Sequence, residues 1–142
     1  MEAMFPGSSA VERKFALRLI ELPPESPVEI NGVRGTAFPV RHPSGGPSYA
    51  LRLAVEDRTL CYTGDTEWVD ALIPAASGAD LLIAEAYTAE RPVPYHLDFA
   101  TLSRHLPQMA ARSVLLTHMN PDMLGRDPQG CIAAEDGKTI PF

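Results

Sequence analysis

Cysteine is scarce in this sequence, and no stretch is apolar enough to suggest a membrane span. Only two of the 142 residues are cysteines, Cys61 and Cys131, and they are too far apart to resemble a paired metal site. Cys61 falls within an apolar run, where a free thiol usually packs as a small buried hydrophobe. No run approaches the roughly 18 apolar residues of a membrane helix, and the N-terminus does not resemble a secretory signal. A reducing cytoplasm is therefore the predicted compartment.

Basic residues and histidines are also few. Twelve lysines and arginines stand against 18 aspartates and glutamates, which gives a net charge of −6, and there are only four histidines. Because phosphate backbones are usually bound by clustered basic residues, this balance does not indicate a nucleic-acid surface. The composition, 45% hydrophobic and 21% charged, is typical of a folded domain, and residues 1–142 are expected to form a single one.

The periodicity of apolar residues predicts a layered α/β domain. Helices are expected at Trp68–Ala76 and, capped by Asp98, at Phe99–Ala111, although Pro107 lies inside the second. The tail Ile132–Phe142 is expected to form two short strands around a turn at Glu135–Lys138. The other expected strands are Phe15–Leu22, Gly35–Val40, Tyr49–Val55, Thr59–Thr63, Asp80–Ala86 and Ser113–Thr117. The Gly-rich turn at 44–47 indicates that the second and third of these are antiparallel neighbours.

Polar residues directly follow three of these apolar strands. His42, Asp65 and His118 each stand just beyond a predicted strand, where an α/β sheet commonly presents its ligand-binding groups. Two imidazoles and a carboxylate suit an ion such as zinc or manganese.

Each of these signals also has an ordinary structural interpretation. A histidine at a strand end is often only hydrogen-bonded, and Gly64-Asp65-Thr66 could be a simple turn in which Asp65 caps the backbone. A Thr-Gly-Asp sequence also occurs in phosphatases of the haloacid dehalogenase type. That alternative fails, because no strand here ends in the Asp-x-Asp nucleophile that those enzymes require.

Taken in order, the polar residues resemble a known pattern. The chain resembles the C-terminal part of metallo-β-lactamase-fold hydrolases, especially the ribonuclease Z-like and related phosphodiesterase branches, from about Phe15 to its last residue. The segments that carry the resemblance are FPVRHPSGGPSYALRL, LCYTGDTEW, DLLIAEAYT, YHLDFATL, LLTHMNPDML and AAEDGKTIPF.

The resemblance implies a role for each of five residues. His42 and His118 would each bind one of two metal ions, and Asp65 would bind both, with Gly64 allowing a sharp turn beside it. Glu85 and His96 would form the carboxylate–histidine pair that stabilises the transition state and protonates the leaving oxygen. A carboxylate partner suits this task because it holds imidazole in one tautomer. A surface acid and a loop histidine are the alternative interpretation of that pair.

The sequence departs from the family in one respect. The His-x-His-x-Asp-His run that supplies most metal ligands is missing, and the fourth histidine, His105, lies within the second predicted helix. Each ion would keep two ligands from this chain, whereas zinc normally has three or four. The chain could be a fragment of a longer protein, which is the interpretation we favour. It could instead need a partner polypeptide that supplies the missing half, or be a degenerate relative. This chain alone is expected to be inactive, and it is possible that it binds no metal.

The expected fold is half of an αββα sandwich, a mixed sheet with helices on one face. Its other face would be exposed and apolar, and exposed apolar faces drive association. We therefore expect either a dimer or swapped oligomer, or a partner that supplies the missing half.

The expected function is metal-dependent hydrolysis of a phosphodiester, with two zinc or manganese ions in the complete protein. The acidic balance favours a small substrate such as a cyclic nucleotide over RNA. The alternative is a noncatalytic, self-associating domain that keeps only the scaffold. A thioester or lactam hydrolase on the same fold is a weaker third option: the pair of Glu85 and His96 disfavours it, although fold alone does not fix the substrate.

Overall fold

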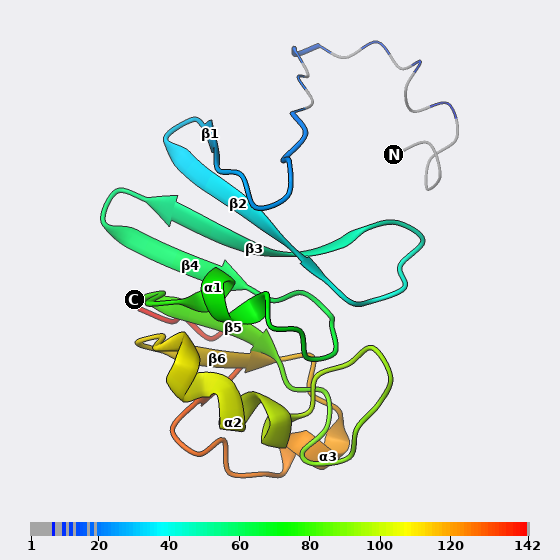
Figure 1. The fold of residues 1–142 in the computed structure, drawn as a ribbon, viewed down its shortest axis with the longest axis vertical. Helices are drawn as coiled ribbons and strands as arrows, with labels where there is room; N and C mark the ends of the chain where they lie inside the picture. The colour runs from blue at the N-terminus through cyan, green and yellow to red at the C-terminus, as the bar shows by residue number, and fades with distance from the viewer. Residues whose placement is uncertain are drawn as a thin grey trace.

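A mixed β-sheet forms the centre of the molecule, with its strands in the order β1-β2-β3-β4-β5-β6-β7 (Figure 1). The computed structural model describes residues 7, 10, 12, 14–16, 18 and 20–141. The strands are β1 (Val28–Ile30), β2 (Val33–Val40), β3 (Ser48–Val55), β4 (Arg58–Tyr62), β5 (Leu81–Glu85), β6 (Val114–Thr117) and β7 (Ile132–Ala133).

The sheet changes from antiparallel to parallel at β4. The first four strands pair antiparallel, and the predicted pairing of β2 with β3 is confirmed, with Thr36 opposite Arg52. From β4 to β7 each strand pairs parallel with the next. Because neighbouring parallel strands end at the same edge of a sheet, the segments that follow β4, β5 and β6 meet there.

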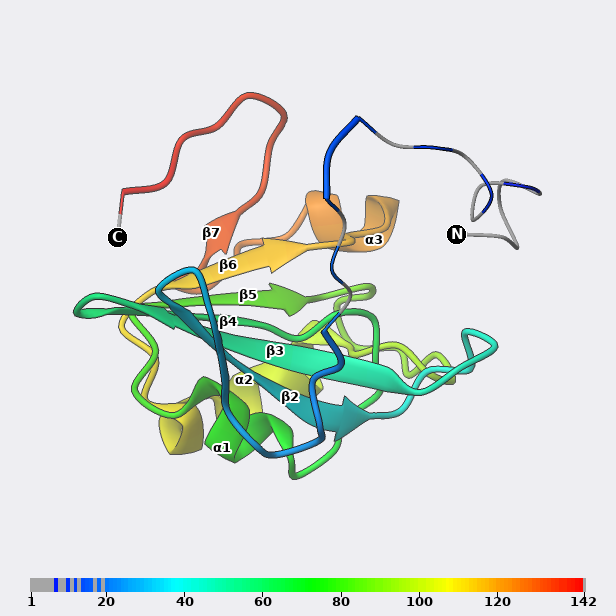
Figure 2. The same ribbon diagram turned by 90° about the horizontal axis from the view of Figure 1, so that it is seen from above.

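Two helices cover one face of the sheet. Helices α1 (Leu72–Ala76) and α2 (Phe99–Met109) lie on the same side in Figure 2, and α3 (Pro121–Leu124) follows β6 at the end of the sheet. The core lies between these helices and the sheet, where Leu72, Leu82, Leu102 and Leu116 are completely buried. The expected mixed sheet with helices on one face is therefore confirmed.

The opposite face of the sheet carries a row of apolar side chains. Strand register places Leu51, Tyr62, Ile83, Leu115 and Ile132 side by side across five strands. Alternation along each strand points them away from the helix-covered core, and none of the five is buried. Tyr62 is 40% exposed. An uncovered face of this kind is what half of a two-sheet sandwich leaves behind.

Helix α2 begins at Phe99, as its sequence predicts, but it ends at Met109, two residues before the expected Ala111. Asp98 is the N-cap, and its side chain accepts a hydrogen bond from the Thr101 backbone N–H at 2.8 Å. Pro107 is accommodated in the last turn, and the C-cap residue Ala110 takes a left-handed conformation with φ of 51°.

Three expected elements are wrong in part. The described residues of Phe15–Leu22 form no strand, and β2 pairs on that edge with β1 at residues 33–35 and with Pro24 at Ala37; residues 17 and 19 lie outside the described part. The first helix is shorter than the expected Trp68–Ala76 and comprises only α1, Leu72–Ala76. Trp68 precedes it, and its ring stacks on that of His105. Within residues 132–141 only β7 forms, and Phe142 lies outside the described part.

Of the helices that the structure describes, none has the length and apolar character needed to cross a membrane.

The open sheet face leads us to expect self-association of the isolated chain. Light scattering should give at least twice the 15.4 kDa mass of one chain, because an apolar face of this extent is costly to leave in water. Tyr62→Glu, which changes the most exposed side chain of the row, should shift the mass toward that of one chain. Leu124→Glu, which changes a side chain 62% exposed on α3, is the matched control and should not. A single-chain mass at every concentration would contradict the expectation.

Candidate metal-binding and catalytic site

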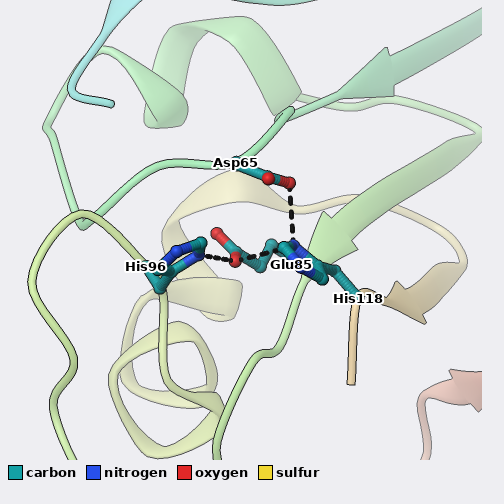
Figure 3. A group of neighbouring side chains, drawn as sticks. All are labelled: Asp65, Glu85, His96 and His118. Atoms are coloured by element: carbon teal, nitrogen blue, oxygen red, sulfur yellow. Dashed lines mark hydrogen bonds and ion pairs between the residues drawn. The ribbon is translucent and has the colours of Figure 1, made fainter. Parts of the chain in front are cut away.

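The candidate site lies at the edge where the parallel strands end (Figure 3). Asp65 follows β4, Glu85 is the last residue of β5, and His118 follows β6. His96 comes from the loop that leads into α2. Two local turns position these groups: Gly64 has a φ of 62°, and His118 itself has a φ of 52°, which is rare for a residue with a side chain.

Glu85 is at the centre of the site and is 1% exposed. Its Oε2 accepts hydrogen bonds from the backbone N–H of Thr66 at 2.9 Å and of Leu97 at 3.3 Å. Its Oε1 lies 2.5 Å from Nδ1 of His96 and 3.1 Å from Nδ1 of His118. One buried carboxylate therefore joins the loop after β4, the loop before α2 and the residue after β6.

Asp65 completes a chain of polar contacts. Its Oδ1 lies 2.9 Å from Nδ1 of His118, so the His118 ring stands between the two carboxylates. The nearby Arg41 pairs with Glu67 at 3.0 Å rather than with either of them. Among the residues that the structure describes, no lysine or arginine forms an ion pair with Asp65 or Glu85. The site thus combines two acids with two imidazoles, a mixture that attracts a cation.

The five residues singled out in the sequence come together, with His42 at the margin. Asp65, Glu85, His96 and His118 offer ligand atoms that all lie within 4.8 Å of one another. His42 is outside this group, although its ring centroid is 5.3 Å from that of His96. His105 lies away from it and stacks on Trp68 with ring centroids 3.7 Å apart.

Sequence reasoning missed three residues that shape the site. The Tyr87 ring lies 4.6 Å from the ring of His96 and 5.3 Å from that of His118, so it limits the movement of both. Thr66 donates its backbone N–H to Glu85, and the hydroxyl of Thr63 accepts the Glu85 backbone N–H at 3.1 Å. The two threonines flank Gly64-Asp65, and Tyr87 follows Glu85 by two residues, so proximity in sequence was the available signal.

The sequence matches a protein family and several curated proteins. Residues 2–119 match the profile described as "Beta-lactamase superfamily domain". The uncharacterized protein ML1173 of Mycobacterium leprae is 37% identical over 86 residues, which are 58% of this chain and 30% of that protein. The uncharacterized protein Rv1339 of Mycobacterium tuberculosis is 33% identical over 86 residues, 58% of this chain and 31% of that protein. The chain thus matches about a third of the length of these relatives.

Solved structures share the fold over most of the chain. The metallo-β-lactamase fold protein YhfI from Bacillus subtilis is 26% identical, with a TM-score of 0.66 over 83% of this chain and 49% of its own. The short form of human tRNase Z is 23% identical, with a TM-score of 0.64 over 81% of this chain and 46% of its own. A diphosphatase of the PhnP family is 20% identical, with a TM-score of 0.72 over 99% of this chain and 53% of its own. The predicted fold is confirmed, and the chain spans about half of each structure.

The hydrogen bonds of Glu85 lead to a prediction about stability. Glu85→Ala leaves the N–H groups of Thr66 and Leu97 without a partner, and it should lower the free energy of unfolding by about 2 kcal/mol or more, since each orphaned buried group costs about 1–3 kcal/mol. Glu85→Gln keeps an oxygen for these donors and should cost clearly less. Urea unfolding of both variants measures the difference. Equal losses would show that the hydrogen bonds to Glu85 do not hold the two loops.

Proposed function

The chain belongs to the beta-lactamase superfamily domain family, and from that membership we propose that it carries one side of the active site of a metal-dependent phosphodiesterase. The observation that carries this proposal is the buried Glu85 carboxylate, which orients His96 beside Asp65 and His118. A purely structural sheet edge has no need of four such groups within 4.8 Å of one another.

The donor set fits zinc or manganese, since imidazole nitrogens and carboxylate oxygens suit both ions. We propose that Asp65, His118 and His42 would hold the ions, with Asp65 a ligand of both, His118 of one and His42 of the other. When bound, such ions supply an activated water and stabilise charge on the phosphoryl oxygens. The contact between Asp65 and His118 at 2.9 Å supports this assignment, because it places two of the donors side by side before any ion arrives.

His96 is proposed as the group that protonates the leaving oxygen. Its Nδ1 is engaged with Glu85, so Nε2 is the nitrogen that remains for the substrate. The Glu85 carboxylate fixes the orientation of the ring. The Tyr87 ring, 4.6 Å from that of His96, restricts its rotation. General acids positioned in this way contribute about 10²–10⁴-fold to the rate.

A small phosphodiester is the proposed substrate. A hollow of about 440 Å³ opens beside His96, and Trp68, Pro92 and Pro94 form part of its wall. Its size suits a leaving group comparable to a nucleoside. The net charge of −6 and the pairing of Arg41 with Glu67 leave little local positive charge for a long RNA backbone.

The remaining metal ligands are proposed to come from polypeptide beyond these 142 residues. The sequence has four histidines and no His-x-His-x-Asp-His run, so Asp65, His42 and His118 supply only part of a two-ion site. A second segment, from a longer protein or a partner chain, would cover the row from Leu51 to Ile132 and bring its own ligands to the edge that holds Asp65.

A hydrolysis assay tests the proposed function. Bis(4-nitrophenyl) phosphate with Zn²⁺ or Mn²⁺ is the probe, and the protein is this chain combined with a polypeptide that supplies the His-x-His-x-Asp-His half of the fold. His96→Gln should lower kcat by about 10²–10⁴-fold with metal content unchanged, because it removes the acid and not a ligand of the assembled site. Asp65→Asn should lower both kcat and metal content.

The control for this assay is Glu29→Gln, which changes an exposed residue of β1, at the opposite end of the sheet from β5 and β6, and should leave kcat unchanged. Stoichiometric metal without hydrolysis in the combined protein would contradict the proposal. So would an unchanged kcat for His96→Gln.

A further inference from the structure

The cluster of Asp65, Glu85, His96 and His118 has an unbalanced charge. Glu85 is 1% exposed, and its only ion-pair partners in the described part of the chain are the two imidazoles. Asp65 likewise pairs only with His118 there. A buried carboxylate is costly unless cations or donors compensate it, and among the described residues neither acid has a lysine or arginine as an ion-pair partner. A bound divalent ion would balance both acids.

The separations within the cluster are close to those around a small metal ion. Two ligand atoms of a tetrahedral ion with bonds of about 2.0–2.1 Å lie about 3.3 Å apart. Nδ1 of His118 is 2.9 Å from Asp65 Oδ1 and 3.1 Å from Glu85 Oε1. One ligand atom from each of the four residues lies within 4.8 Å of the corresponding atoms of the other three. Replacing the shared protons with an ion would require the 2.5 Å contact between Glu85 and His96 to open and the longest separations to close toward the spacing of about 3.3 Å.

The donors are also held in place without an ion. Oε2 of Glu85 is occupied by the backbone N–H groups of Thr66 and Leu97, so Oε1 is the oxygen that faces the two rings. Tyr87 packs against both rings, with centroids 4.6 and 5.3 Å away. Donors fixed in this way lose little freedom on binding, and such support usually changes metal affinity by about 10–100-fold.

We propose that this chain by itself binds one divalent transition-metal ion through Asp65, Glu85, His96 and His118, without His42. This ligand set differs from the one proposed for the assembled enzyme, where His42 is a ligand and Glu85 and His96 are not. An imidazole that binds the ion cannot deliver a proton, so the isolated chain with its ion bound is expected to have no hydrolytic activity. The incoming ligands of the other segment then release His96 to act as the acid, a consequence that rests on the proposed function.

The test is a titration of the metal-free chain with Co²⁺, followed by its visible absorption and by calorimetry. One ion per chain is expected, with the intense absorption of a four-coordinate site. His96→Gln preserves the hydrogen bond to Glu85 but removes a ligand nitrogen, so it should weaken binding at least as much as loss of a supporting contact, about 10–100-fold. His42→Gln is the matched control, from a ring only 5.3 Å away from that of His96, and should leave the dissociation constant unchanged.

The outcomes separate this proposal from the proposed function. Equal weakening by His42→Gln and His96→Gln, or no saturable binding of Co²⁺, would overturn the four-residue ligand set. Neither result bears on hydrolysis by the combined protein, which depends on ligands from outside this chain. Conversely, a combined protein that binds metal but does not hydrolyse phosphodiesters would contradict the proposed function. The four-residue ligand set would still be decided by the Co²⁺ titration of the isolated chain.

Discussion

The site is organised by the burial of one carboxylate at the end of β5. Glu85 is 1% exposed, so every lone pair that it presents must meet a donor inside the protein. The backbone N–H groups of Thr66 and Leu97 meet Oε2, and this orders the loop that carries Asp65 and the loop that carries His96. The Nδ1 atoms of the two imidazoles lie within hydrogen-bonding distance of Oε1. The position of each polar group therefore follows from satisfying Glu85.

The topology of the sheet explains why these groups converge. Strand β4 pairs antiparallel with β3 and parallel with β5, so it is the boundary between the two halves of the sheet. The parallel half ends its strands at one edge and delivers Asp65, Glu85 and His118 there. The antiparallel half contributes only His42, from the turn after β2, which explains its place at the margin of the cluster.

Much of this arrangement could be predicted from the sequence, and the failures have physical causes. Short apolar runs, with alternation in Tyr49–Val55, located β2 to β6, and polar residues at strand ends located the site. Phe15–Leu22 alternates in part as well, but a strand also needs a partner, and the outer edge of β2 pairs instead with β1 at residues 33–35 and with Pro24 at Ala37. The Asn31-Gly32 turn, with both φ angles positive, is a strong hairpin signal for β1 that was overlooked. No local pattern shows that His96 and His118 share one oxygen of Glu85, because that depends on how two loops pack.

The protonation of the imidazoles in the metal-free chain, measured by ¹H–¹⁵N NMR at neutral pH, tests the central role of Glu85 most directly. An ionised carboxylate can only accept hydrogen bonds, so Nδ1 of both His96 and His118 should carry a proton. The resonances of both rings should change together in Glu85→Gln, while those of His105 stay constant. Two neutral rings protonated only at Nε2, and insensitive to Glu85→Gln, would contradict that role.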